Sequence, residues 1–191
     1  TLGEPISRKE VTDYIFGFVL FNDWSARDIQ SWEYQPLGPF LSKNFASTIS
    51  PWVVTAEALA PFRTTAPPQE PTPLSYLQTT GKTAYDIQLQ VSLQTTKSSK
   101  VLICETNYKK MYWTIFQQIL HHSSSGCNLQ IGDLLASGTI SGESRNEQGC
   151  LLEITQGGKL PLQISSKEQR TFLEKGDVVE LYGFCQKDKL R

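Results

Sequence analysis

The stretch "DWSARDIQSWEYQPLGPFLSK", which begins at Asp23, concentrates polar side chains directly after the apolar run "YIFGFVLF". If residues 26–34 are helical, Arg27, Gln30 and Tyr34 lie on one face, because they are spaced i, i+3 and i+7. Asp23 precedes that helix, at the end of an expected strand, where a carboxylate is a natural ligand for a hard divalent cation. Arg27 and Gln30 would point donors into the same space, as an oxyanion site requires.

A structural interpretation of the same stretch is favoured by spacing alone. Asp23 and Asp28 could cap the helix while Arg27 pairs with Asp28, and helix caps are far commoner than catalytic sites. Lys43 follows "PLGPF", a turn stiffened by Pro and Gly that could aim its ammonium group at a developing negative charge. Most lysines, however, are solvated surface groups. The spacing therefore leaves both interpretations open.

Two later segments carry further candidate groups. "SGTISG" at residues 137–142 offers hydroxyls and close backbone approach, or is simply a tight turn. Glu153 is an acid inside the apolar, strand-like "CLLEIT", so it is functional only if its side of the strand lines a cleft. His121 and His122 end a predicted helix and point about 100° apart, so they cannot readily bind one metal. We interpret these two histidines as structural.

The first half of the chain predicts a few short elements. "SRKE" at residues 7–10 fits a capping box and indicates a short helix. "YIFGFVLF" at residues 14–21 is typical of a fully buried strand, and "ISPWVVTAEAL" indicates another strand. The helix after Asp23 must end by Pro36. Residues 61–75 carry five prolines in "PFRTTAPPQEPTPLS" and predict a loop.

The second half shows the clearest periodicities. "YDIQLQVSLQ" alternates and predicts a strand with one wet face, paired with "KVLICETNY" through the turn "TTKSSK". "YWTIFQQIL" predicts a helix whose apolar face is Tyr112, Ile115, Phe116, Ile119 and Leu120. After Gly126, "DLLASGTIS", "CLLEIT", "LPLQIS" and "DVVELYGFC" all indicate strands. These elements predict a mostly β, largely antiparallel architecture with one substantial helix.

Composition excludes several classes of protein. The chain has 191 residues, 39% hydrophobic and 19% charged, which is ordinary globular composition for one domain or slightly more. A net charge of −1 offers no field for nucleic acid or an anionic membrane. No apolar run approaches the ~20 residues of a membrane span, and no signal-peptide core begins the chain. The four cysteines, which are scattered without a C-x-x-C pair, are expected to be reduced thiols of a cytosolic protein.

Several quoted segments resemble, in the same order, the fumarylacetoacetase family. They are "NDWSARDIQSWEYQPLGPFLSK", "STISPWVV", "YKKMYWTIFQQILHHSSSGCNLQIGDLLASGTISG" and "LLEIT", which together cover nearly the whole chain. "ND-x-SARD-x-Q" marks only the broad superfamily, which includes acylpyruvases and oxaloacetate decarboxylases. "WEYQPLGPFLSK" and "HHSSSGCNL" are much more specific. The resemblance implies a β-rich α+β fold, a mixed β-sandwich or roll with one substantial helix.

The resemblance also implies a reaction and its residues. The family hydrolyses a carbon–carbon bond of a β-diketo acid, fumarylacetoacetate, to fumarate and acetoacetate, the last step of tyrosine breakdown. The metal would be Mg²⁺ or Ca²⁺, with Asp23 as a ligand and Lys43 and Ser47 bordering the site; the family has Thr where this chain has Ser47. The oxyanion hole would be Arg27, Gln30 and Lys43. The substrate contacts would be Gln30, Tyr34 and Thr139. Glu153 would orient the catalytic histidine.

The family pattern extends beyond this sequence at both ends. The family's Glu-x-Glu metal-ligand pair, its catalytic histidine and its SH3-like domain match positions upstream of Thr1, and its Gly-rich tail lies after Arg191. The sequence also lacks an initiator Met. We therefore expect residues 1–191 to be a partial catalytic domain that binds metal weakly and does not turn over the substrate alone.

Two alternatives to this expectation remain open. The chain could be a non-catalytic truncated paralogue or splice form that keeps the fold. It could also belong to a related β-diketone hydrolase or decarboxylase, although "PLGPFLSK" argues against that. The family forms homodimers, and the resemblance carries that expectation to the full-length protein.

Overall fold

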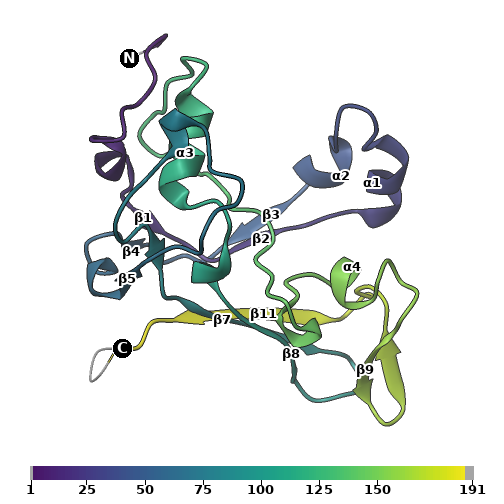
Figure 1. The fold of residues 1–191 in the computed structure, drawn as a ribbon. Coiled ribbons are helices and arrows are strands. Elements are labelled where there is room, and N and C mark those ends of the chain that lie inside the picture. The colour runs from purple at the N-terminus through teal and green to yellow at the C-terminus, as the bar shows by residue number, and fades with distance from the viewer. Residues whose placement is uncertain (1, 188–191) are drawn as a thin grey trace.

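The computed structural model describes residues 2–187, whose longest strands form a three-stranded antiparallel sheet in the order β11-β7-β8 (Figure 1). The strands are β7 (Gln88–Gln94), β8 (Val101–Asn107) and β11 (Val178–Phe184). In the central register, Val91 of β7 lies between Cys104 and Leu181. The predicted strand pair and the final predicted strand are therefore confirmed.

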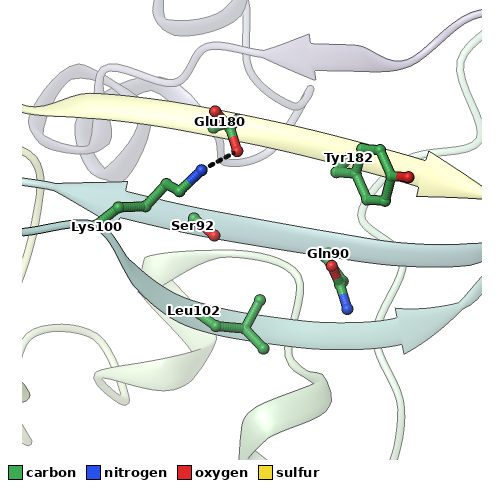
Figure 2. A pocket seen from close by; sticks show the side chains of 6 residues that line it. All are labelled: Gln90, Ser92, Lys100, Leu102, Glu180 and Tyr182. Carbon is green, nitrogen blue, oxygen red and sulfur yellow. Dashed lines mark hydrogen bonds and ion pairs between the residues drawn. The ribbon is translucent and has the colours of Figure 1, made fainter.

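The alternation along β7 gives the sheet two different faces, as predicted. Leu93 is completely buried on the inner face. The outer face holds an open pocket lined by Gln90, Ser92, Lys100, Leu102, Glu180 and Tyr182 (Figure 2). The Lys100 ammonium lies 2.8 Å from the Glu180 carboxylate across this face. Because none of these six residues is a predicted site residue, the outer face is not the candidate site.

The predicted helix is α3 (Ile115–Ser123), and it begins with a capping box. The Thr114 hydroxyl accepts a hydrogen bond from Gln117 N, and Gln117 Oε1 accepts one from Thr114 N, so two free amides of the first turn are satisfied. Tyr112 lies before the helix, so its predicted place on the helical face is wrong. The remainder of that face is Ile115, Phe116, Ile119 and Leu120.

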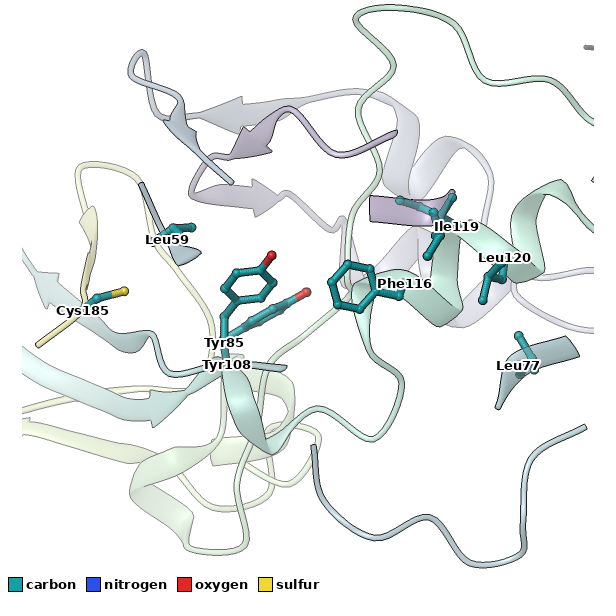
Figure 3. Close-up of a cluster of buried hydrophobic side chains, with 9 residues drawn as sticks. Leu59, Leu77, Tyr85, Tyr108, Phe116, Ile119, Leu120 and Cys185 are labelled. Atoms are coloured by element: carbon teal, nitrogen blue, oxygen red, sulfur yellow. The ribbon is translucent and has the colours of Figure 1, made fainter. Parts of the chain in front are cut away.

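The main hydrophobic core lies between α3 and the segments at one end of the three-stranded sheet (Figure 3). Tyr85 packs edge-on against Phe18, with ring centroids 4.9 Å apart, and also contacts Phe116. Burial raises the pKa of Tyr108 to about 12. The core residues are Val11, Leu59, Leu77, Tyr85, Tyr108, Phe116, Ile119, Leu120 and Cys185. This core joins segments from the whole chain, from Val11 to Cys185, and Phe18 packs against it.

The prediction of one fully buried strand at residues 14–21 is wrong. The run is divided between β1 (Gly17–Phe18) and β2 (Phe21–Asp23), which pair with β4 (Val54–Thr55) and β3 (Ser47–Ile49). Each pair is a sheet of only two strands, and both faces of such a sheet are buried only where other elements pack on them. Phe16 accordingly remains 77% exposed. The second predicted strand, in "ISPWVVTAEAL", is confirmed only over β4 and the end of β3.

The predicted strands at "DLLASGTIS" and "CLLEIT" are also wrong. The first segment has no regular structure, and the second forms the short helix α4 (Leu151–Ile154). Three successive residues with positive φ, Gln156, Gly157 and Gly158, end this turn in a conformation that a strand cannot adopt. The chain then forms the hairpin of β9 (Leu162–Ser165) and β10 (Glu168–Arg170), so the strand predicted at "LPLQIS" is confirmed.

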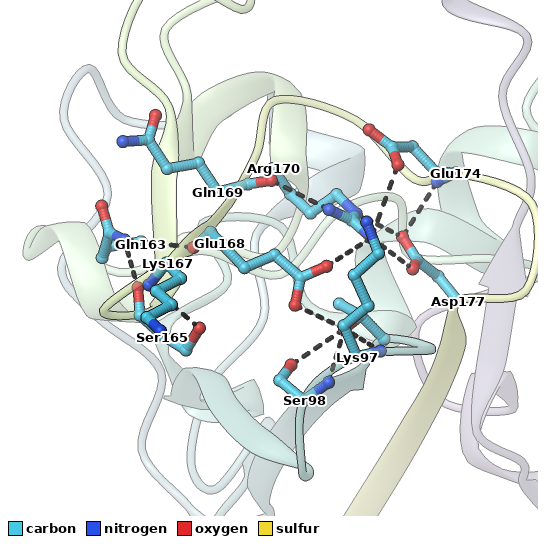
Figure 4. Close-up of polar contacts among 11 residues, drawn as sticks. Lys97, Ser98, Gln163, Ser165, Lys167, Glu168, Gln169, Arg170, Glu174 and Asp177 are labelled. Atoms are coloured by element: carbon cyan, nitrogen blue, oxygen red, sulfur yellow. Dashed lines mark hydrogen bonds and ion pairs between the residues drawn. The ribbon is translucent and has the colours of Figure 1, made fainter.

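A buried ion network fixes this hairpin against the β7–β8 turn (Figure 4). The Arg170 guanidinium donates to both oxygens of Asp177, at 2.9 and 3.0 Å, and lies 3.1 Å from Glu168. Glu168 in turn accepts a hydrogen bond from Thr95 Oγ1. The hydrogen bond from Arg170 lowers the pKa of the Asp177 carboxyl. The network therefore ties the β9–β10 hairpin to Thr95, which follows β7, and to Asp177, which precedes β11.

The remaining elements are short. Ser7 and Glu10 form the predicted contact, but they precede only a 3₁₀ turn at Val11–Tyr14. Within the proline-rich loop predicted at residues 61–75, the chain forms only β5 (Arg63–Thr64), which pairs with β6 (Ala84–Tyr85), and the ends of two 3₁₀ turns. The fold is thus a β-rich α+β arrangement of several small sheets, as predicted. Within residues 2–187, no helix has the length and apolar character needed to cross a membrane.

Candidate active site

The predicted metal-site residues meet where β2 ends. Asp23 is the last residue of β2 and is paired directly with Ser47 of β3, so their side chains lie on the same face. Lys43, from α2 (Leu41–Asn44), places its ammonium nitrogen 2.9 Å from Asp23 Oδ2. The structure thus brings together a carboxylate, a hydroxyl and an ammonium group from three elements.

The predicted helix after Asp23 is α1 (Arg27–Glu33). Arg27 Nη1 donates to Gln30 Oε1 at 2.7 Å, which confirms that the two side chains share one face. The alternative of Asp23 and Asp28 as helix caps is wrong, because the N-cap residue is Ala26 and no side chain caps α1. The Asp28 carboxylate accepts a hydrogen bond from the adjacent amide of Ile29, and Asp23 pairs with Lys43.

Glu33 holds α1 and α2 together, a role that sequence reasoning missed. Its carboxylate accepts hydrogen bonds from the backbone amides of Phe40 at 2.7 Å, Leu41 at 3.3 Å and Ser42 at 2.8 Å. Ser42 contributes most to lowering the pKa of Glu33. The buried Ser42 hydroxyl lies beside the Glu33 carboxylate, outside hydrogen-bond geometry, and the Ser42 amide donates a hydrogen bond to that carboxylate. Because Lys43 follows these amides directly, Glu33 fixes the segment that carries Lys43.

The two other predicted substrate contacts are exposed. Tyr34 is the C-cap residue of α1, and its hydroxyl accepts a long hydrogen bond, 3.4 Å, from Gln35 Nε2. Thr139 lies in the irregular segment between α3 and α4, on the side where Gly149 passes closely. Both side chains are therefore accessible to a ligand.

Glu153 lies on α4 rather than on a strand, with its carboxylate held by neighbouring side chains. Ser141 Oγ lies 3.1 Å from Oε1 and 2.9 Å from Oε2, and the Cys150 thiol lies 3.1 Å from Oε2. Sequence reasoning missed Ser141 and Cys150 as partners of Glu153. The "SGTISG" pattern pointed to the segment of Ser141 but not to this contact.

The predicted residues form two groups. The first group comes from residues 23–47 and consists of the Asp23, Lys43 and Ser47 cluster and the Arg27–Gln30 pair. The second group is Thr139 and Glu153, which come from the later segment. One electrostatic effect links the groups: burial raises the pKa of Cys150, beside Glu153, and the positive charge of Arg27 opposes that rise. The convergence of both groups on one concave surface stays a prediction.

The histidines and cysteines form no second site in the described part of the chain. His121 Nδ1 is 2.9 Å from the Tyr76 hydroxyl, and His122 Nε2 is 3.8 Å from Cys127 Sγ, at the end of α3. All four cysteines are free thiols. Over residues 2–187, no group of three or more His, Cys, Asp or Glu side chains could by itself hold a metal ion.

Comparison with known proteins identifies the family of this chain. Residues 2–187 match the protein family described as fumarylacetoacetate (FAA) hydrolase C-terminal. The fumarylacetoacetase of Dictyostelium discoideum is 54% identical over 97% of this chain and 44% of its own length. The fumarylacetoacetases of Arabidopsis thaliana and Homo sapiens are 52% and 51% identical, over 98% and 100% of this chain. The chain spans slightly under half the length of these relatives, 44% of the plant protein and 46% of the human one. The chain belongs to the fumarylacetoacetate hydrolase family.

Proposed function

We propose that this chain supplies part of the active site of a hydrolase that cleaves fumarylacetoacetate into fumarate and acetoacetate. The observation that carries the proposal is the cluster at the end of β2, where Asp23, Lys43 and Ser47 meet, with the Arg27–Gln30 pair on the helix that follows in the chain. Three cationic or amide donors on two short helices suit a substrate rich in carboxylate and ketone oxygens. The names of the relatives support this choice of substrate.

The chemistry of the reaction explains the need for these donors. Water adds to a carbonyl carbon, the adjacent carbon–carbon bond breaks, and its electron pair leaves as an enolate that then takes a proton. Negative charge therefore develops on ketone oxygens in both steps. Lys43 and Arg27 carry the opposite charge, and Gln30 offers an amide N–H, so they can stabilise these oxygens in an oxyanion site.

We propose Mg²⁺ or Ca²⁺ as the cofactor, with Asp23 and Ser47 as ligands and Lys43 at the border of the site. A carboxylate and a hydroxyl are the hard oxygen donors that these cations prefer. The described residues supply only part of the ~6 oxygen ligands required, so substrate, water or other residues must complete the shell. When bound, the cation would polarise the substrate's oxygens.

Glu153 and Thr139 complete the proposal for the site. Glu153 would accept a hydrogen bond from the catalytic histidine and so fix that ring's orientation. Thr139 and Tyr34 would contact the substrate through hydroxyls that are exposed in the structure. Neither His121 nor His122 is proposed as the base, because their rings contact Tyr76 and Cys127 at the end of α3.

We also propose that the protein is a cytosolic homodimer. The four free cysteines suit a reducing compartment. Large apolar side chains, among them Trp32, Leu37 and Trp52, are more than 80% exposed, which suits an interface. The molecule proposed to bind at the site is a small β-diketo acid, the substrate.

A substrate panel separates this function from its alternatives. We would replace the matching part of human fumarylacetoacetase, 46% of that protein, with this chain and assay the chimera with Mg²⁺ or Ca²⁺. Fumarylacetoacetate, an acylpyruvate and oxaloacetate would be supplied in parallel. We expect fumarylacetoacetate to be cleaved at the highest kcat/KM. A preference for either other substrate would favour the related hydrolase or decarboxylase, and a folded chimera inactive on all three would favour the non-catalytic alternative.

A further inference from the structure

We propose that Ser141 is a positioning residue whose hydroxyl fixes the Glu153 carboxylate; this inference rests on the function proposed above. Ser141 Oγ lies within hydrogen-bond distance of both carboxylate oxygens, at 3.1 and 2.9 Å. Its single proton is shared between two oxygens that both belong to Glu153. The hydroxyl therefore restrains the rotation of the carboxylate as well as its position.

The same hydroxyl joins Glu153 to the segment that carries Thr139. Ser141 Oγ accepts a hydrogen bond from Gly149 N at 3.0 Å, using a lone pair while its proton is donated to Glu153. A Cβ atom at Gly149 would lie 2.4 Å from Ile140 O and 3.0 Å from Thr139 Cγ2, so the two backbones are in direct contact. A change at Ser141 would therefore alter Glu153 and its distance from a proposed substrate contact together.

The remaining restraints on Glu153 are weak. Cys150 Sγ lies 3.1 Å from Oε2, but a thiol is a weak donor. The helix α4 has only four residues. Within residues 2–187, no Lys, Arg or His side chain forms an ion pair with Glu153. Ser141 is thus the strongest donor to this carboxylate, and an ionised carboxylate can still accept an imidazole N–H beside it.

Loss of the hydroxyl should act on the chemical step rather than on substrate binding. Partners that orient a catalytic group typically contribute ~10–100-fold to activity. Ser141→Ala should therefore lower kcat by about 10-fold or more and leave KM nearly unchanged. Ser141→Thr retains a hydroxyl and should recover most of the rate. A side chain with a purely structural role would not show this split between kcat and KM with recovery by Thr.

Ser137 provides a matched control in the same segment. Its hydroxyl donates to the neighbouring carbonyl of Gly138, at 3.0 Å, and forms no hydrogen bond with Glu153 or any other described residue. Ser137→Ala, Ser141→Ala and Ser141→Thr would be compared in the human chimera described above. We expect a normal kcat for Ser137→Ala. An unchanged kcat for Ser141→Ala, in a chimera that is itself active, would overturn the inference.

A second measurement tests whether Ser141 restrains Glu153 and does not depend on an activity assay. In the 191-residue chain, NMR relaxation of the Glu153 side-chain methylene groups and hydrogen exchange of the Gly149 amide would be recorded. Ser141→Ala should mobilise the Glu153 side chain and speed exchange at Gly149, while amides of β7 stay protected. An unchanged Glu153 side chain would overturn the inference. An inactive parent chimera would reject the proposed function, whereas these spectra would still decide whether Ser141 holds Glu153.

Discussion

Lys43 and Asp23, twenty residues apart in sequence, form an ion pair with 2.9 Å between the ammonium and a carboxylate oxygen. Their side chains are 30% and 44% exposed, so the pair contributes little to folding: exposed pairs are worth about 0–1 kcal/mol. The pair joins the end of β2 to the short helix α2. Because it adds so little stability, we interpret it as a feature of the site rather than of the fold. It aligns the proposed metal ligand with the proposed oxyanion donor.

The first prediction is that Asp23→Asn affects activity far more than it affects stability. The substitution should change the free energy of unfolding by less than about 1 kcal/mol, because the lost pair is exposed. It should lower kcat/KM of the chimera by at least about 100-fold, because it removes the one carboxylate of residues 2–187 that is proposed as a metal ligand. Urea unfolding and steady-state kinetics measure the two effects.

Glu180→Gln is the control for this variant. It removes the Lys100–Glu180 pair, which is more exposed than the Lys43–Asp23 pair and lies on the outer face of the sheet. We expect a comparable small change in stability and no change in activity. Equal activity of the Asp23→Asn and Glu180→Gln variants would contradict the assignment of Asp23.

The second prediction concerns the dependence of the α1–α2 unit on pH. Contact with Ser42 and the nearby amides lowers the pKa of Glu33 in the folded state. A lowered carboxyl pKa contributes stability above the unfolded-state value of about 4.3, and that stability is lost as the pH falls through the folded value. Glu33→Gln should therefore lower Tm at pH 7 and flatten the Tm profile below about pH 4.5.

Glu57→Gln is the matched control for Glu33. Glu57 is exposed, and its side chain has no hydrogen bond or ion pair with residues 2–187. Its replacement should leave the Tm profile unchanged. Parallel profiles for the Glu33→Gln variant and the unsubstituted chain would show that Glu33 does not hold α2.

The third prediction is that Cys127 is the first thiol to be alkylated in the folded chain. Burial raises the pKa of Cys104 to about 11, so only about a thousandth of that thiol is ionised at pH 8. Burial also raises the pKa of Cys150 and Cys185, whereas Cys127 is exposed. Iodoacetamide labelling followed by peptide mass spectrometry should find Cys127 modified first. Early labelling of Cys104 would mean that the core is more open than the structure indicates.

The fourth prediction is weak binding of divalent cations by the 191-residue chain. Asp23 and Ser47 supply two of the ~6 ligands that these cations require. Calorimetric titration with Mg²⁺ or Ca²⁺ should therefore give a dissociation constant in the millimolar range or weaker. Asp23→Asn should abolish the remaining heat. Tight, stoichiometric binding would require a ligand set other than the one proposed here.

The sequence predicted elements best where periodicity was long. β7 and α3 each repeat a clear pattern over at least seven residues, and both were predicted, although α3 begins only after Tyr112; β8 was predicted as the partner of β7. The apolar run at residues 14–21 misled the prediction because local hydrophobicity does not reveal how many layers cover a strand. "CLLEIT" forms the short helix α4 instead of a strand, and the positive-φ residues after it reverse the chain. Periodicity alone cannot decide between helix and strand in such a short apolar run.

The candidate site was predictable in its residue types but not in its contacts. Spacing placed Arg27 and Gln30 on one helical face, and the structure confirms it. The Asp23–Ser47 pairing depends on the register of two short strands, which no local pattern encodes. The contacts of Glu33 and Ser141 join segments through turns, so only the folded chain reveals them.

The most direct test of the proposed function is the kcat of the human chimera with and without Lys43→Met. Both proteins would first be shown to be folded by circular dichroism, and loss of fumarylacetoacetate absorbance would then be followed with Mg²⁺ or Ca²⁺. We predict turnover by the parent chimera within about 10-fold of the human enzyme, and a loss of about 100-fold or more in the Lys43→Met variant, as for removal of an oxyanion donor. A folded parent chimera without turnover, or a Lys43→Met variant that keeps full activity, would contradict the account.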